Sequence, residues 1–196
     1  MLETLIAQMG IIAVMVGTPG PNNFLLMSSG VHFGVKRTLP LVAGIIVGCL
    51  SMISLLAGGL SPVLEQHPQA LLILRFLCAG FLLYLVVRLL RANQALRGGQ
   101  ARLSPLGFWR GLAFQWVNPK AWMMCLTLLA MQTPEHSSPV STLALLVAFV
   151  FLSAPILTSW SAAGQSLKGW LNRGKHLLWF NRLTAAALAA TVFMLV

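Results

Sequence analysis

Hydrophobic residues form six long stretches along the chain, separated by short polar segments. The stretches cover approximately residues 4–34, 39–60, 70–90, 111–131, 140–163 and 177–196. Each one supplies the roughly 20 apolar residues that a helix needs to cross a bilayer. The pattern therefore predicts an all-α integral membrane protein with six transmembrane helices.

Composition agrees with this prediction. The chain is 58% hydrophobic and only 8% charged, whereas a soluble domain is roughly 25% charged. No polar segment between the stretches is long enough to form a soluble catalytic domain. We therefore expect one transmembrane domain over residues 1–196.

The net charge of +10 is unevenly placed. Basic residues gather between stretches 1 and 2, 3 and 4, and 5 and 6, at Lys36, Arg37, Arg88, Arg91, Arg97, Arg102, Arg110, Lys168, Arg173, Lys175 and Arg182. Cytoplasmic loops of membrane proteins carry this excess of Lys and Arg, so we expect both termini outside. Contact with anionic lipid headgroups is a sufficient use for the charge, and no nucleic acid is expected.

The six stretches divide into two halves of three. The first repeat covers about residues 1–95, the second about 111–196, and a basic cytoplasmic loop at about 91–110 joins them. Because three is an odd number of spans, the second repeat must be inserted upside down relative to the first.

Each half opens with a helix that proline interrupts, at Pro19-Gly20-Pro21 and at Asn118-Pro119. At a rise of 1.5 Å per residue, Pro21 lies about 22 Å and Asn118 about 12 Å from the inner boundary. Both breaks are therefore near mid-membrane. Interrupted helices at matching positions of inverted repeats point to a transporter binding site.

The break in helix 1 combines acceptors and donors. Pro19 and Pro21 cannot donate to earlier carbonyls, and we expect Asn22 to cap the helix that restarts. The amides of that restart suit a substrate carboxylate, and the freed carbonyls suit an ammonium group. The alternative is a simple kink whose free groups bond to neighbouring helices. The predicted binding residues are Thr18, Pro19, Gly20, Pro21, Asn22 and Asn23.

The break in helix 4 places a cation at membrane depth. Pro119 is expected to free the carbonyl of Gln115, and Lys120 follows it without a carboxylate at similar depth. Lys120 must snorkel to the surface, pair with carbonyls, lose its proton or meet an anionic substrate group. Asn118 and Gln115 either line the cavity or bond between helices.

Several other residues have two readings. Tyr84 and Ser159 either line the cavity, or anchor and pack their helices. His32 is expected to be solvated at the inner surface rather than to relay protons. Gly44-x-x-x-Gly48 is a close-packing motif, either within the monomer or in a homodimer.

The sequence carries no pattern of an enzyme or a metal site. Cys49, Cys78 and Cys125 lie one in each of three helices and are expected to pack as small apolar residues. No acid pair, zinc motif or Ser–His set lies at membrane depth. We expect neither catalysis nor a cofactor.

Two motifs resemble one family. Gly17-Thr18-Pro19-Gly20-Pro21-Asn22-Asn23 is similar to the helix 1 signature of the LysE (lysine exporter) superfamily, in its RhtB (homoserine/threonine exporter) branch. Phe108-x-x-Gly111 with Asn118-Pro119-Lys120-Ala121 is similar to its helix 4 signature, and Gly80 with Tyr84 to helix 3. Pro-Gly-Pro-Asn-Asn followed by Ser28-Ser29 most resembles the cysteine and O-acetylserine exporters of that group.

The resemblance implies export of an amino acid across the bacterial inner membrane, driven by protons. Many relatives carry Asp where Asn22 stands, so the usual carboxylate for a proton is missing and Lys120 is a candidate carrier. Without a balancing acid, we expect a neutral zwitterion of the cysteine, O-acetylserine, threonine or homoserine type, or a small anion. A channel-type facilitator and a non-transporting scaffold are the alternatives.

Overall fold

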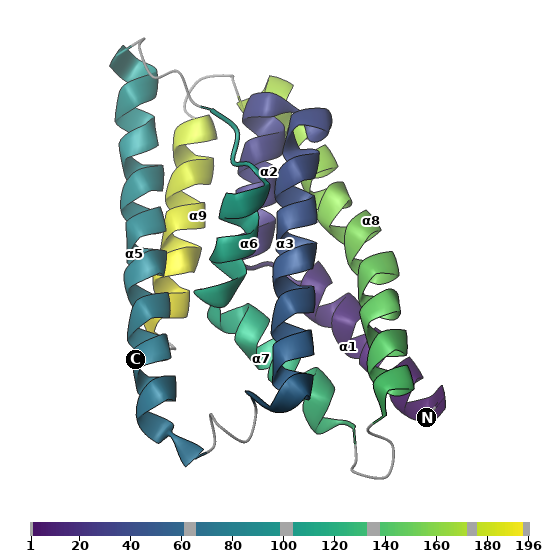
Figure 1. Ribbon diagram of the computed structural model, residues 1–196. Helices are drawn as coiled ribbons and strands as arrows, with labels where there is room; N and C mark the ends of the chain where they lie inside the picture. Colours follow the sequence, from purple (N-terminus) through teal and green to yellow (C-terminus); the bar gives the residue numbers. More distant parts are fainter. Residues whose placement is uncertain (1, 61–65, 99–103, 133–137, 172–175, 194–196) are drawn as a thin grey trace.

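The computed structural model describes residues 2–60, 66–98, 104–132, 138–171 and 176–193, and the regular structure of these residues is entirely helical. The elements, drawn in Figure 1, are α1 (Leu2–Gly17), α2 (Pro21–Phe33), α3 (Val35–Leu55), the wider turn η1 (Leu56–Leu60), α5 (Pro68–Gly98), α6 (Phe108–Trp116), α7 (Pro119–Ala130), α8 (Pro139–Leu171) and α9 (His176–Phe193). The prediction of an all-α protein is confirmed. Because α5 continues to Gly98, the first eight residues of the loop expected at 91–110 are helical.

Two described helices are long and apolar enough to cross a membrane. They are Val35–Leu60, which joins α3 and η1, and α8. The bent pair α1 and α2 makes a third if it is counted as one span. Pro155 lies inside α8 without ending it.

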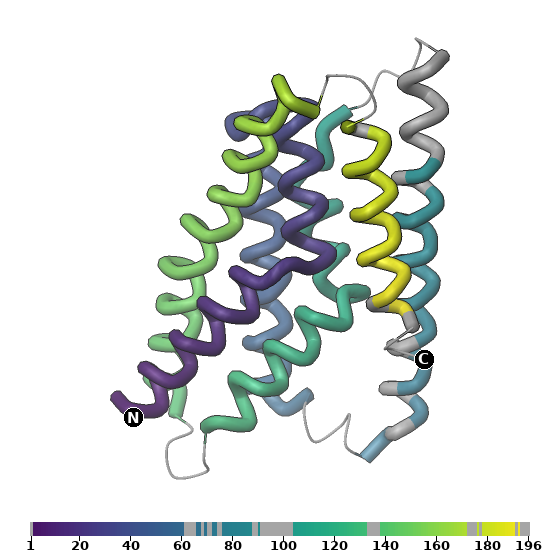
Figure 2. Tube along the Cα trace, turned by 180° about the vertical axis from the view of Figure 1, so that it is seen from behind, coloured from purple at the N-terminus to yellow at the C-terminus, as the bar shows by residue number. Residues whose placement is uncertain are grey.

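Two interruptions divide the helices that open each half of the chain. α1 and α2 meet at an angle of 52° across residues 18–20, where proline removes backbone donors. α6 and α7 are separated by Val117 and Asn118. Figure 2 shows both bends at mid-height of the bundle, beside each other.

Glycine allows two pairs of helices to pack with their backbones in contact. On α2 and α8, a Cβ at Gly30 would collide with the Ser161 carbonyl oxygen, and one at Gly164 with that of Met27. On α3 and α6, a Cβ at Gly44 would collide with the carbonyl oxygen of Phe108. The Gly44-x-x-x-Gly48 motif is therefore used within the monomer.

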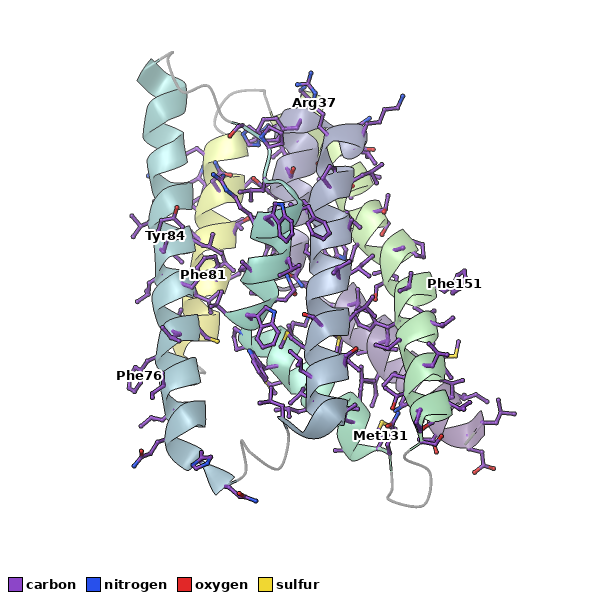
Figure 3. The ribbon with its side chains drawn as sticks, in the orientation of Figure 1. Arg37, Phe76, Phe81, Tyr84, Met131 and Phe151 are labelled. Atoms are coloured by element: carbon purple, nitrogen blue, oxygen red, sulfur yellow. The ribbon has the colours of Figure 1, made fainter. Side chains whose placement is uncertain are left out.

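The remaining helices complete a layered bundle. α3 packs on α8 in the centre, and α5 packs on α9 at one side (Figure 1). Large apolar side chains such as Phe76 and Phe151 point outward (Figure 3) and are 60% and 75% exposed, as expected for contact with lipid. Arg37 and Met131 mark opposite ends of the bundle in the same view.

Candidate functional site

The start of α2 differs from the predicted cap. Gly20 is the N-cap, with extended backbone angles of φ −176° and ψ −179°, and no side chain caps the helix. Pro21 explains the difference, because proline has no N–H and suits the first helical position. The prediction that Asn22 caps α2 is therefore wrong, and its side chain is free to reach across to the second break.

Asn22 joins the two interrupted helices through its amide. Its Nδ2 donates to Gln115 Oε1 at 2.9 Å, and Gln115 Nε2 donates back to Asn22 Oδ1 at 3.0 Å. Asn118 Nδ2 donates to the same Asn22 oxygen at 3.2 Å. Gln115 and Asn118 are 0% and 1% exposed, so these bonds form in a largely dry environment. Gln115 and Asn118 thus both bond between helices, and Asn118 also lines the cavity described below.

Asn23 satisfies two carbonyls of the first break. Its Nδ2 donates to Val16 O at 2.9 Å and to Thr18 O at 2.7 Å. An unpaired carbonyl in a low-dielectric environment costs several kcal/mol. The two adjacent asparagines thus have different partners. Asn23 bonds to carbonyls of the first break, and Asn22 bonds to residues at the second.

Lys120 also donates to oxygens of the first break, and it shares the Thr18 carbonyl with Asn23. Its Nζ donates to Thr18 O and Thr18 Oγ1, both at 2.8 Å, and to Pro19 O at 3.3 Å. An ammonium group has three N–H donors, and three oxygens surround it here. Of the four alternatives given for Lys120, the structure shows the one in which it pairs with carbonyl groups.

Gly20 makes room for this lysine. A Cβ at Gly20 would lie 3.0 Å from Lys120 Cδ and 3.1 Å from its Nζ. Those distances are closer than carbon and nitrogen atoms normally approach without a bond. The absence of a side chain at position 20 therefore lets the lysine lie along the backbone of the break.

The hydrogen bonds at the second break differ from those that the sequence predicted. The Gln115 carbonyl accepts from Asn118 N at 3.1 Å, so it is not freed by Pro119 as predicted. Asn118 caps α7 by accepting from Lys120 N at 3.2 Å. Trp122 Nε1 donates to Trp116 O at 2.8 Å. The carbonyl that needs a side-chain partner is thus that of Trp116.

A small cavity lies between the two breaks, and we call it the central cavity. Its volume is about 30 Å³, and its lining residues are Met15, Val16, Gly20, Asn22, Asn23, Ile45, Cys49, Asn118, Lys120, Ala121, Met124, Phe149 and Leu157. That volume is roughly the share of one water molecule in the liquid. The cavity must therefore enlarge before it can admit an amino acid.

Seven of the predicted residues do not line the central cavity, namely Thr18, Pro19, Pro21, Gln115, Pro119, Tyr84 and Ser159. The first five belong to the two interrupted segments themselves, whereas Tyr84 and Ser159 lie apart from them. Ser159 is exposed, and its hydroxyl donates to Ile156 O at 2.7 Å. Tyr84 is 55% exposed and borders a separate cleft with Arg110 and Phe114. Neither lines the central cavity.

Sequence reasoning missed two contributors. Cys49 lines the central cavity, and its thiol lies 3.6 Å from Gln115 Oε1. Gln8 donates to Leu128 O at 2.7 Å and so joins α1 to α7. A lone glutamine inside an otherwise apolar helix was the available signal for the second contact. The residues that the structure describes hold no cluster of three metal-ligating side chains.

Comparisons with known proteins point to one family. The sequence profile of the LysE type translocator family matches residues 13–196. A cysteine/O-acetylserine efflux protein of Klebsiella pneumoniae is 29% identical over 164 residues, which are 83% of each chain. One from Salmonella choleraesuis is 30% identical over 113 residues, 58% of this chain and 57% of that protein. No solved structure matches the chain.

Proposed function

Since the chain belongs to the LysE-type translocator family, we propose that it is a secondary transporter that exports a neutral, zwitterionic amino acid across the bacterial inner membrane. Substrates of the cysteine, O-acetylserine, threonine or homoserine type fit the proposal, and two similar proteins carry the name cysteine/O-acetylserine efflux protein. The chain acts as a carrier in this proposal and not as an enzyme.

One observation supports the proposal above the others, namely the position of the Lys120 ammonium group. It donates hydrogen bonds to the Thr18 and Pro19 carbonyl oxygens. The same acceptors suit the ammonium group of a substrate. When an amino acid binds, its ammonium group replaces that of Lys120 at these oxygens. The displaced lysine then pairs with the substrate carboxylate, so the number of charge-assisted bonds is kept.

The start of α2 offers donors to the same carboxylate. Asn22 and Asn23 are in its first turn and line the central cavity, and the amino end of a helix carries a partial positive charge. Glu3, at the start of α1, is the one carboxylate among the described residues. A cationic substrate would therefore meet Lys120 without a balancing acid, whereas a zwitterion supplies its own.

The packing of the helices supports an inverted repeat of six spans. Under that arrangement, α1 with α2 corresponds to α6 with α7, α3 to α8, and α5 to α9. The structure packs α3 against α8 and α5 against α9, and each interrupted helix packs on the second helix of the other half. A two-fold axis in the membrane plane produces this set of pairs.

The charge distribution supports an orientation. Arg37 lies at one end of the bundle in Figure 3, whereas α1 begins and α9 ends toward the other end in Figure 1. The positive-inside rule then places the basic end in the cytoplasm and both termini outside. Outward-facing apolar side chains contact the lipid, and a homodimer would need a surface other than the covered Gly44–Gly48 motif.

The volume of the central cavity favours alternating access. A channel-type facilitator needs a continuous path, but the space between the two breaks is only about 30 Å³. We propose that α1 with α2 and α6 with α7 open this cavity to one side at a time. Export against a gradient requires a driving ion, and protons are the proposed one.

The test is transport of labelled O-acetylserine by proteoliposomes that contain purified protein. Lys120→Met keeps the length of the side chain but removes its charge. Loss of one charge-assisted hydrogen bond costs about 1.5–3 kcal/mol, so we expect the concentration for half-maximal exchange to rise roughly 10- to 150-fold. Lys36→Met, on the exposed start of α3, is the matched control and should behave as the unmodified protein. Unchanged exchange by Lys120→Met would overturn the proposed site.

A further inference from the structure

A second cavity, lined mostly by apolar side chains with a few polar groups, lies against α2, and we call it the side cavity. Its volume is about 110 Å³, roughly the share of four water molecules. α2 contributes Ser28 and His32, and α9 contributes Asn181 and Thr184. Pro21 lines one end of it, next to Asn22 of the central cavity. The two cavities are therefore separated by the first turn of α2.

His32 presents a nitrogen that has no partner among the described residues. Its Nδ1 lies 2.8 Å from the Ser28 carbonyl oxygen, and a carbonyl only accepts, so Nδ1 carries a proton. Its Nε2 is buried and makes no hydrogen bond. In the neutral ring, Nε2 then holds a lone pair. A buried acceptor left without a partner costs about 1–3 kcal/mol, and a proton or a water bound at Nε2 removes that cost.

The side cavity beside His32 is uncharged and mostly apolar, with hydroxyl and amide groups from a few side chains. Apart from His32 itself, no charged or titratable side chain lines the side cavity in the described part of the chain. Among the side chains that the structure describes, the cations on the neighbouring helices lie outside its lining and are exposed. They are Lys36 and Arg37 on α3, Arg110 on α6, Lys168 on α8, and Arg182 on α9, which lies over the Trp179 ring.

Lys120 is less suited than His32 to take up a proton in this state. Its Nζ has three oxygen acceptors, which match the three N–H groups of the charged form. Histidine, in contrast, is the side chain whose charge ordinarily changes between about pH 5 and 8. His32 was expected to be solvated at the inner surface, but its free nitrogen is buried beside a cavity.

We propose that His32 Nε2 is the site that binds the driving proton. The lone pair of Nε2 takes one proton and forms an imidazolium ion, while Nδ1–H stays on the Ser28 carbonyl. The charge favours water in the side cavity and separation of α2 from α9, and loss of the proton reverses the change. Because α2 also carries Asn22, movement of this helix links the proton to the central cavity. The inference rests on the proposed export of an amino acid.

Two assays on the same proteoliposomes separate this inference from the proposed function. The first measures exchange of labelled for unlabelled O-acetylserine without a pH gradient, and the second measures accumulation driven by an imposed pH gradient. His32→Gln keeps hydrogen-bonding groups but takes up no proton. We expect this variant to retain exchange and to lose accumulation. His67→Gln, at an exposed position before α5, should retain both.

The outcomes are distinguishable. Absence of exchange in the unmodified protein would refute the exporter proposal itself. Gradient-driven accumulation by His32→Gln, with intact exchange, would overturn only the role of His32.

A titration tests the same claim without any change at position 32. In a variant whose His67, His136 and His176 are glutamine, the one remaining imidazole is that of His32. Its NMR signals should show both the neutral and the charged ring as the pH is changed, and the proportion of the charged ring should change when O-acetylserine is added. An imidazole that keeps one protonation state, with and without O-acetylserine, would overturn the proposal even if His32→Gln fails to fold.

Discussion

The amide of Asn22 is the most informative group to remove, because it bonds both to Gln115 at the end of α6 and to Asn118 in the second break. Asn22→Ala deletes three hydrogen bonds of 2.9, 3.0 and 3.2 Å to Gln115 and Asn118. Gln115 Nε2 keeps the Gly111 carbonyl at 3.1 Å. Gln115 Oε1 keeps only the Cys49 thiol at 3.6 Å, and Asn118 Nδ2 keeps no partner among the described residues.

Two buried polar groups are therefore left poorly satisfied. Each such group costs about 1–3 kcal/mol, which sums to roughly 2–6 kcal/mol. The lost side chain enlarges a cavity of about 30 Å³, and a water that enters it recovers part of this cost. We expect Asn22→Ala to lower the free energy of unfolding by about 2–4 kcal/mol.

A double-mutant cycle measured by denaturant unfolding of the purified protein tests the bond pattern. Gln115→Ala removes the partner of Asn22, so the double variant should lose less stability than the sum of the single variants, by about 1–3 kcal/mol. Thr127→Ala is the control, because its hydroxyl bonds only to Met123 O on an exposed face. It should change stability by less than about 0.5 kcal/mol. Additive effects of Asn22→Ala and Gln115→Ala would refute the reasoning.

Two further changes test packing and charge. Gly164→Ala should prevent stable folding, because its Cβ would collide with the Met27 carbonyl. A Cβ at Gly80 meets no atom within 4 Å, and alanine favours a helix over glycine by about 1 kcal/mol, so Gly80→Ala should not lower the melting temperature. Equal melting temperatures would contradict the close packing of α2 on α8. Asn22→Asp should let lysine compete with O-acetylserine for exchange, since a carboxylate then balances the second positive charge. Failure of lysine to compete would contradict the charge argument for neutral substrates.

The fold was predictable to the extent that local patterns determine it. Apolar stretches located the helices, and the prolines at 19, 21 and 119 located both interruptions. The predicted N-cap of α2 was wrong because a neighbouring residue determines where the helix begins. Asn22 is a good capping residue in isolation, but Pro21 occupies the first helical position and moves the cap to Gly20.

Long-range contacts were outside the reach of the sequence pattern. The sequence allowed four alternatives for Lys120. Its hydrogen bonds to the Thr18 and Pro19 oxygens join chain segments about a hundred residues apart, which a local pattern does not predict. Gly44 and Gly48 predicted that another helix packs closely on α3, but not that this helix is α6. His32 looked solvated because its position along the helix says nothing of the neighbouring α9.

The central claim is that the two interruptions form one binding site for the amino acid. Cys49 lines the central cavity, and Cys78 does not, so the two native thiols supply a probe and its internal control. The measurement is the rate of alkylation by N-ethylmaleimide at each cysteine, resolved by mass spectrometry, with and without O-acetylserine. We predict that O-acetylserine slows the reaction of Cys49 and leaves that of Cys78 unchanged. Equal rates at Cys49 with and without substrate would contradict the account.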